Sequence, residues 1–252
     1  TVSGIKHGWI ARKENMENQL IVPDEVKQAL TVAGWDMDKE LNELHTESSG
    51  FELPRVRIEH KDNGKHRMHI DMGESYLDDD SQEIVIPGNK LTAVVFAEQF
   101  IRAFWEKESE VPLCSAIDDQ PIGQEILSDN CKHCDHGVIG GSCKPKVRLL
   151  MLAEIDGEVR PLIMNLSPTS IKFWNAHKKK LQRSNLPVVA VNTTFELEDV
   201  KKGSYRWATV KLGMDGIASK EMLIIAKTAR TELEALTDRI TPSDFDDAGD
   251  KF

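Results

Sequence analysis

The stretch KVRLLMLAEIDGEVRPLIMNL, residues 146–166, carries the clearest structural signal in this 252-residue chain. Two runs rich in apolar residues flank Asp156-Gly157. An Asp-Gly pair between such runs is typical of a tight β-hairpin turn, because both residues tolerate the positive φ angles that the turn requires. We therefore expect two antiparallel strands here.

Two further hairpins are predicted on either side. RVRIEHK (55–61) and KHRMHIDMG (65–73) alternate apolar and polar residues around Asn63-Gly64, and a short strand is expected in QEIVIPG (82–88). PVVAVNTTFELEDV (187–200) and SYRWATVKLG (204–213) are joined through Lys-Lys-Gly. Hairpins of this kind favour a small β-barrel or curled sheet over a parallel βαβ sheet.

Helices are expected between and after the hairpins. Residues 91–109 carry aromatics at a spacing of four, which predicts a helix. Ser167 as N-cap and Pro168 in the first turn predict a helix over 167–183. A long amphipathic helix is expected over 219–240, ended by Pro242, and a short one over 23–35. The predicted fold class is mainly β with helices.

Three parts of the chain are expected to differ in character. Residues 1–50 form a helical or extended N-terminal arm, residues 51–240 form the β core with an insertion at about 112–145, and residues 241–252 form a disordered acidic tail. No apolar run approaches the roughly 18 residues of a membrane span, and the first residues lack the apolar core of a secretory signal. We expect a cytoplasmic protein, in the host cell if the chain is phage-encoded.

Charge is unevenly distributed along the sequence. The formal net charge is −10, yet residues 144–211 hold 13 Lys and Arg against 6 Asp and Glu, a local charge of +7. The remainder therefore carries −17. A basic middle with a separate acidic end fits a polyanion-binding surface combined with an anionic arm.

Four cysteines, Cys114, Cys131, Cys134 and Cys143, fall within thirty residues in the pattern C-x16-C-x2-C-x8-C. A C-x-x-C pair lets two thiolates from one turn reach the same ion, and the flanking cysteines complete a tetrahedral zinc site with Zn–S distances of about 2.3 Å. Nothing resembling H-x-E or HExxH accompanies the cluster, so structural Zn²⁺ is expected rather than catalytic zinc. Gly137, Gly140 and Gly141 would let the loop fold back around the ion.

Motifs of enzymes are otherwise missing from the sequence. There is no phosphate-binding G-x-x-x-x-G-K-[ST], no G-x-G-x-x-G after a strand and no G-x-S-x-G. The acids at 78–80 and 118–119 lie in acid-rich runs typical of solvated loops. We therefore expect no enzymatic activity.

Basic and aromatic residues recur together, as single-strand binding requires: cations follow phosphates and aromatic rings stack on bases. Trp174 is expected in the core, Tyr205 and Trp207 fit either the core or stacking, and Lys178–Lys180 alone would also fit a solvated helix face. The predicted DNA-binding set is Arg55, Arg57, Lys65, Arg67, Lys172, Lys178, Lys179, Lys180, Arg183, Tyr205, Arg206, Trp207 and Lys211.

Several segments within residues 50–220 resemble a known protein family. The segments PLCSAIDD, CKHC, GGSCKPKVRLLML, PLIMNLSPTSIKFWNAHKKKLQRSN and GSYRWATVKLG are similar to phage-encoded, zinc-containing single-stranded DNA-binding proteins. The resemblance is loose outside the cysteines and the SPTS segment. It implies an OB-like core of antiparallel hairpins with an inserted zinc loop and flanking helices.

The ending DFDDAGDKF also resembles the acidic tails, closed by Phe, of bacterial and phage single-stranded DNA-binding proteins. Such an arm presents an aromatic anchor and a carboxylate to a basic pocket on a partner, and it can compete with DNA for the protein's own groove. Lys251 and Ala248-Gly249 depart from the bacterial ending, which favours phage replication partners. The predicted partner-binding residues are Asp244, Phe245, Asp246, Asp247, Asp250 and Phe252.

Together these features predict a non-enzymatic single-stranded DNA-binding protein of phage replication or recombination. Its tail would recruit a DNA polymerase, a helicase-primase or a recombinase. Three alternatives stay open: a zinc-ribbon transcription or recombination factor acting on duplex DNA or RNA polymerase, a nuclease or nucleotide-processing enzyme, and an RNA-binding regulator.

Overall fold

The computed structural model divides the chain into two compact units, residues 1–52 with 73–82, and residues 53–72 with 83–252. The structure describes residues 32–34, 53–61, 63–73, 83–106, 109, 112–122, 125–137, 141–233, 240 and 244–245. The fold below is therefore that of the second unit, and most of the helix predicted over 23–35 lies outside the described residues. In this part of the chain, no helix is both long and apolar enough to cross a membrane.

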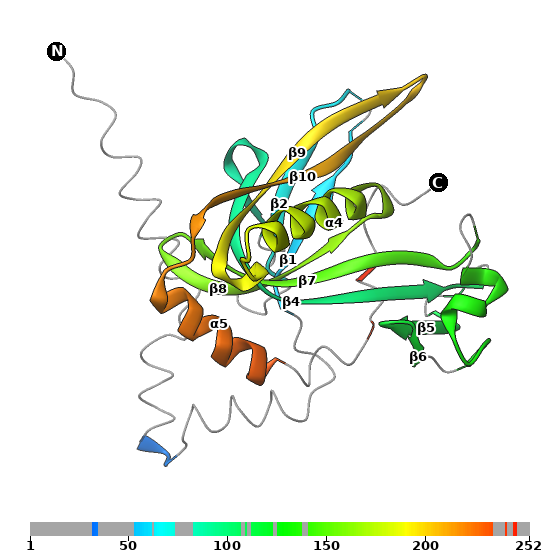
Figure 1. Cartoon of the computed structure of the whole chain (residues 1–252), viewed down its shortest axis with the longest axis horizontal. Helices are drawn as coiled ribbons and strands as arrows, with labels where there is room; N and C mark the ends of the chain where they lie inside the picture. Colours follow the sequence, from blue (N-terminus) through cyan, green and yellow to red (C-terminus); the bar gives the residue numbers. More distant parts are fainter. Residues whose placement is uncertain are drawn as a thin grey trace. The chain divides into compact units, whose positions relative to one another are not determined.

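The centre of the second unit is a Greek key of four strands (Figure 1). Strands β4 (Lys90–Phe104), β7 (Lys144–Ile155) and β8 (Glu158–Leu166) pair antiparallel in that order. Helix α4 (Pro168–Arg183) then leads the chain back to β9 (Val191–Lys202), which pairs with β4. Apart from the inserted strands between β4 and β7, the spatial order β9-β4-β7-β8 is that of three successive strands with a fourth returning beside the first.

The β7–β8 hairpin has the turn predicted from the sequence. Ile155 pairs with Glu158, so the connection is the two residues Asp156 and Gly157. Both have positive φ angles, 53° and 85°, as a type I′ turn requires. This prediction is confirmed.

The other predicted hairpins also form. Strands β1 (Arg55–Glu59) and β2 (Arg67–Asp71) pair antiparallel, and β2 continues to the short strand β3 (Glu83–Val85). Strand β10 (Tyr205–Ile217) pairs with β9. The sheet runs β10-β9-β4-β7-β8-β1-β2-β3, and β1 joins β8 in parallel, so the sheet is mixed. The predicted fold class, mainly β with helices, is confirmed.

The helix predicted over 91–109 is wrong, because β4 occupies Lys90–Phe104. A bulge between Val95 and Ala97 interrupts the two-residue alternation of apolar and polar residues, so the sequence pattern does not indicate a strand here. After the bulge, Glu98 and Gln99 face opposite sides of the sheet and both find polar partners. The Glu98 carboxylate accepts a hydrogen bond from Trp174 Nε1, and the Gln99 side-chain oxygen accepts one from Arg148.

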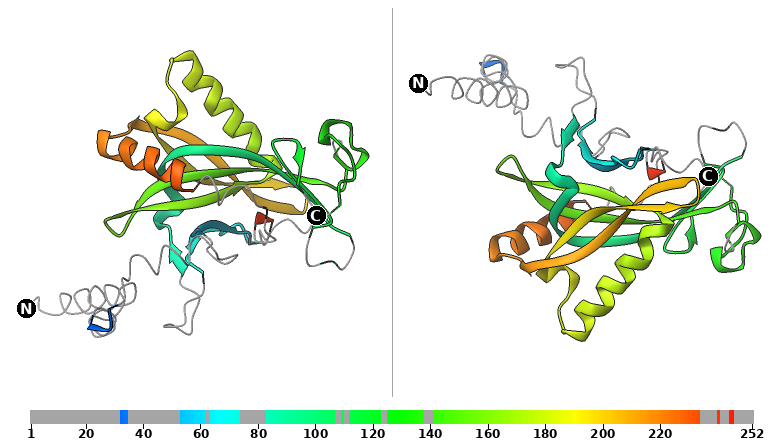
Figure 2. Two further views of the ribbon diagram at one scale, coloured as in Figure 1. Left: turned by 90° about the horizontal axis from the view of Figure 1, so that it is seen from below. Right: turned by 90° about the horizontal axis from the view of Figure 1, so that it is seen from above.

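The two sides of β7 contribute to two cores, and one helix packs against each core. Both helices lie beside the sheet in Figure 2. Val147, Leu149 and Met151 join the larger core, in which Trp174 of α4 is fully buried. Leu150 and Leu152 on the opposite side pack with Ala226 of α5 (Lys220–Glu232). The helices predicted over 167–183 and 219–240 are thus confirmed, the second as far as the structure describes it.

The N-caps of these helices differ. Ser219 accepts a hydrogen bond from the Met222 N–H, as an N-cap should. Ser167 occupies the N-cap position of α4, but its hydroxyl contacts Thr169 and Ser170 instead of a backbone N–H. The expected side-chain cap at Ser167 is therefore wrong.

Candidate nucleic-acid interface and metal centre

One face of the sheet carries three buried cations beside the Greek key. Lys146 and Arg148 lie two residues apart on β7 and so point to the same side. Arg55 of β1 joins them, and the three residues are 0%, 2% and 7% exposed. Gln99 and Asn165 sit opposite Arg148 on the two neighbouring strands. We call Arg55, Gln99, Lys146, Arg148 and Asn165 the basic face.

The carboxylate of Asp244 lies on the basic face. Arg55 Nη1 donates to Asp244 Oδ1 at 2.7 Å, and Arg148 Nη2 donates to Oδ2 at 2.5 Å. Asn165 Nδ2 donates to the backbone oxygen of Asp244 at 2.9 Å. Two arginines and an amide around one carboxylate form an anion site, since guanidinium groups match carboxylate and phosphate alike.

Phe245 covers the end of the basic face next to Asp244. Its ring meets that of Trp105 edge-on at 4.9 Å and lies 5.2 Å from Lys146 Nζ. Ile101 and Ala103 of β4 complete the apolar surround. The prediction of a disordered tail from residue 241 is therefore wrong at Asp244 and Phe245, which are 1% and 8% exposed.

Two residues of the predicted partner-binding set take part in these contacts. Asp244 and Phe245 are buried against their own chain, because Arg55 and Arg148 attract the acid and Trp105 contacts the ring. The remaining predicted partner-binding residues, Asp246, Asp247, Asp250 and Phe252, lie outside the described residues.

Electrostatics show what Asp244 contributes. Burial lowers the pKa of Arg148, the Asp244 carboxylate raises it again, and the like charge of Arg55 lowers it further. A buried guanidinium beside another cation is costly unless an anion compensates. The basic face is therefore built to hold an anion.

A second basic region lies at the tips of two hairpins. The Arg206 side chain lies so close to Gly64 that a Cβ on this glycine would meet its guanidinium carbon at 2.1 Å. Asp199 accepts from Arg206 Nη2 at 2.6 Å, which is the main reason why its pKa falls to about 2, and it also contacts His66 Nε2 at 3.0 Å. Tyr205 beside them is 62% exposed.

The predicted DNA-binding residues are thus dispersed. Only Arg55 belongs to the basic face. Several others already pair with acids: Arg57 with Asp71, Arg67 with Glu59 and Glu83, Lys178 with Glu98, Arg206 with Asp199 and Lys211 with Glu198. Lys65 is exposed in the β1–β2 loop, and Lys172, Lys179, Lys180 and Arg183 are exposed on α4.

The sequence interpretation missed Lys146, Arg148 and Asn165. The signal was present in the alternation of Lys144, Lys146 and Arg148 at the start of β7, which places three cations on one side of a strand. Trp207 is half-buried, and its indole Nε1 is enclosed with no hydrogen-bond partner in the described part of the chain. Trp207 is therefore neither fully in the core nor fully at the surface, and both predicted roles, core packing and stacking on bases, stay open.

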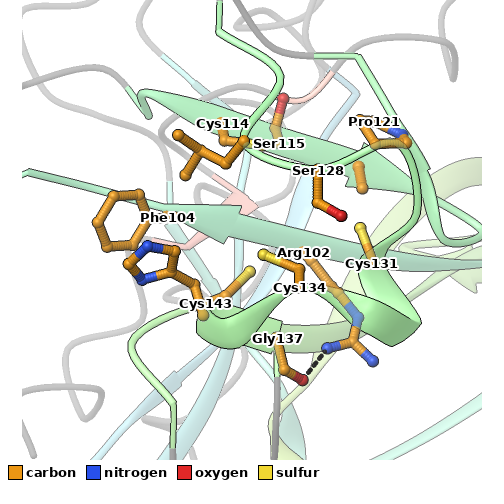
Figure 3. Close-up of a pocket in the computed structure, with 13 residues that line it drawn as sticks. Arg102, Phe104, Cys114, Ser115, Pro121, Ser128, Cys131, Cys134, Gly137 and Cys143 are labelled. Atoms are coloured by element: carbon orange, nitrogen blue, oxygen red, sulfur yellow. Dashed lines mark hydrogen bonds between the residues drawn. The ribbon is translucent and has the colours of Figure 1, made fainter.

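The four cysteines converge on the end of β4 (Figure 3). Cys114 begins β5 (Cys114–Ile117) and pairs with Phe104, the last residue of β4. Cys143 directly precedes β7, whose Lys144 pairs with Ala103 on the other side of β4. Cys131 and Cys134 lie in the turn between, and all four line one cavity of ≈ 20 Å³.

Backbone hydrogen bonds shape this turn. Cys134 N donates to Cys131 O, Gly137 N to Cys134 O, and Cys143 N to His136 O. A Cβ at Gly137 would lie 2.6 Å from Cys131 O, so the close turn requires glycine there. Arg102 Nη1 donates to Gly137 O at 2.9 Å and fixes the turn to β4.

The cysteine side chains as they stand do not form a ligand shell. Among the described residues, no three His, Cys, Asp or Glu side chains are arranged to hold a metal ion. The pKa of the Cys143 thiol is raised to about 11, chiefly by burial; the charge of Arg102 opposes the rise, and the other three cysteines contribute to it. The donor set of four thiols around a cavity of about one water in size nevertheless fits the chemistry of zinc.

Comparison with known proteins identifies no relative. No family model, no curated protein and no solved structure matches this chain.

Proposed function

We propose that this chain is a single-stranded DNA-binding protein that holds phosphates on the basic face. The observation that supports this proposal is the contact of the Asp244 carboxylate with Arg55 and Arg148. An anion from the acidic tail occupies a site whose buried cations need one. When the tail departs, a phosphate of the nucleic acid can take the place of the carboxylate, because the same guanidinium groups serve both.

The fold supports this proposal. A five-stranded Greek-key barrel is the architecture of the OB-fold, whose sheet face and loops bind oligonucleotides. Here the Greek key β4-β7-β8-β9 is extended by β10, with α4 between β8 and β9. We infer an OB-like core, and Tyr205, which is 62% exposed, would stack on bases.

Structural zinc is part of the proposal. Cys114, Cys131, Cys134 and Cys143 would hold Zn²⁺ after rotation of their side chains toward the shared cavity. Bound there, zinc would supply a fixed crosslink between β5, the turn and β7, and it would perform no chemistry. Because Cys143 lies three residues before Lys146, the crosslink would fix the start of the strand that presents the basic face.

The acidic tail would have two roles. Asp244 and Phe245 shield the basic face until DNA displaces them. Asp246, Asp247, Asp250 and Phe252 would recruit a replication or recombination protein, most simply one encoded by the same phage. A hydrophobic anchor in an acidic arm suits a basic apolar pocket on such a partner.

Photo-crosslinking tests where the DNA binds. A thymidine-rich oligonucleotide containing 5-iododeoxyuridine is irradiated with the full chain, and crosslinked peptides are identified by mass spectrometry. We expect crosslinks in β1, β7, β8 or the β9–β10 tip. Crosslinks confined to α4 would contradict the proposed interface. The crosslinking is repeated with unlabelled competitor DNA. If duplex DNA suppressed the crosslinks as strongly as single-stranded DNA does, a zinc-ribbon factor that binds duplex DNA would be favoured instead.

A further inference from the structure

Strand β10 forms one end of the sheet, and half of its outer edge is protected. The Ala208 N–H donates to His60 Nδ1 at 3.1 Å, and the Val210 N–H donates to Ser170 Oγ at 3.0 Å. Side chains thus occupy backbone donors that would otherwise attract another strand. Native proteins commonly protect exposed sheet edges against pairing with another chain.

The protection stops after Val210. Backbone direction repeats every two residues along a strand, so the N–H groups of Leu212 and Met214 point outward like those of Ala208 and Val210. The hydrogen bonds of the described residues include no equivalent cap at either position. Met214 is 47% exposed and Ile217 is 58% exposed, so apolar side chains also lie open at this edge.

The sequence of this edge is complementary to itself. We propose that a second copy of this chain pairs with it, antiparallel and two-fold symmetric about Gly213. In that register Lys211 lies opposite Asp215 of the second copy, and Leu212 lies opposite the second copy's Met214. Opposite residues share a face of the sheet, so the pairing joins charge to charge on one face and apolar to apolar on the other.

Local geometry agrees with this register. Gly213 would sit at the centre, where two strands approach to about 4.5 Å between Cα atoms, and the absence of side chains allows it. Lys211 already pairs with Glu198 of the neighbouring strand β9, so in the dimer its ammonium would be shared between Glu198 and Asp215 of the second copy. Asp215 has no ion-pair partner among the residues that the structure describes, and it would gain one.

The edge also sets the length of the ladder. A register shift follows Met214, and Gly216 has φ 84°, so the strand bends away there. Ser170 blocks the ladder at Val210 on the other side. Only the pairs between Leu212 and Met214 can form, which gives a small contact and therefore a weak, reversible dimer.

Charge reversal tests the pairing in the full chain. Sedimentation equilibrium should show a monomer–dimer equilibrium for the wild type. Asp215→Lys places lysine opposite lysine, and Lys211→Asp places aspartate opposite aspartate, so each variant alone should weaken dimerisation about tenfold or more. Mixed in equal amounts, the two variants should form a heterodimer, because their charges are then complementary. Glu232→Lys, an equal charge change on α5, should dimerise like the wild type.

Three results would overturn the inference: a wild type that stays monomeric at about 1 mM, where even a weak dimer is populated; an Asp215→Lys variant that dimerises like the wild type; or a mixture that does not associate. Thermal melting of each variant verifies that it is folded. None of these results depends on DNA binding, so the dimer and the proposed function stand or fall separately.

Discussion

Replacing Phe245 with alanine separates the shielding role of the tail from its recruiting role. The substitution leaves every charge in place and removes the ring that packs on Trp105, Ile101 and Ala103. Burial of a phenylalanine side chain stabilises by about 1.5–3 kcal/mol. Since about 1.4 kcal/mol corresponds to a factor of ten, undocking of the tail should become roughly 10- to 100-fold more favourable.

DNA affinity should respond because the docked tail and the phosphates compete. The apparent dissociation constant equals the intrinsic one divided by the fraction of molecules with an open basic face. If the tail is mostly docked, Phe245→Ala should bind oligo-dT several-fold to tenfold more tightly at low salt. Phe252→Ala is the matched control, with the same chemistry in the same tail, and should bind oligo-dT like the wild type.

Fluorescence-quenching titration measures both affinities, and the five tryptophans of the chain supply the signal. The melting temperature of Phe245→Ala should fall by only a few degrees, about 2–4 °C per kcal/mol, because undocking leaves the two main cores intact. An affinity of Phe245→Ala within twofold of both the wild type and Phe252→Ala would refute the shielding role. A global loss of folding would show instead that Phe245 is part of the core.

Four further results are expected. Elemental analysis should find one zinc per chain, and chelation should lower the melting temperature, because the free energy of zinc binding adds to that of folding; metal-free protein from a chelator-free purification would exclude the site. Tyr205→Ala should weaken oligo-dT binding by about 1–3 kcal/mol without unfolding, whereas Trp207→Ala should also lower stability, because Trp207 is half-buried. Replacing Lys179 and Lys180 by alanine should flatten the salt dependence of binding by about 0.7 per lost phosphate contact if α4 touches DNA. Asp199 has a pKa lowered to about 2, so its stabilising pairing with Arg206 is complete above about pH 4 and is lost as the pH falls through 2; the difference in melting temperature between wild type and Asp199→Asn should therefore shrink over that range.

The hairpins could be predicted because their turns are local. Asp156-Gly157 and Asn63-Gly64 specify positive φ angles whatever surrounds them, and the flanking alternation identifies the strands. Helix α4 could likewise be predicted from Pro168 in its first turn and from the helical spacing of Ile171, Trp174 and Leu181. In each case the residues that determine the element lie within it.

Strand β4 and the tail could not be predicted because their causes lie far away in sequence. The bulge in β4 breaks the alternation of apolar and polar residues. Glu98 and Gln99 fit a strand within the sheet because Trp174 and Arg148, which are distant in sequence, donate hydrogen bonds to them. The tail appears disordered by composition, yet Asp244 meets Arg55 across 189 residues. Local composition cannot reveal a pairing of that kind.

The four cysteines were singled out by their spacing alone. Their convergence on one cavity depends on the register that places Cys114 and Cys143 on either side of β4, which spacing cannot supply.

Binding of the full chain to oligo-dT, measured over a range of salt concentrations and against duplex competitor, decides whether this chain is a single-stranded DNA-binding protein. With roughly four phosphates contacted, log K should fall with log salt concentration at a slope of about −3, and duplex DNA should compete weakly. Saturable binding with that slope and that preference is the predicted result. Absence of saturable quenching at low salt, or equal binding of duplex DNA, would rule out this function.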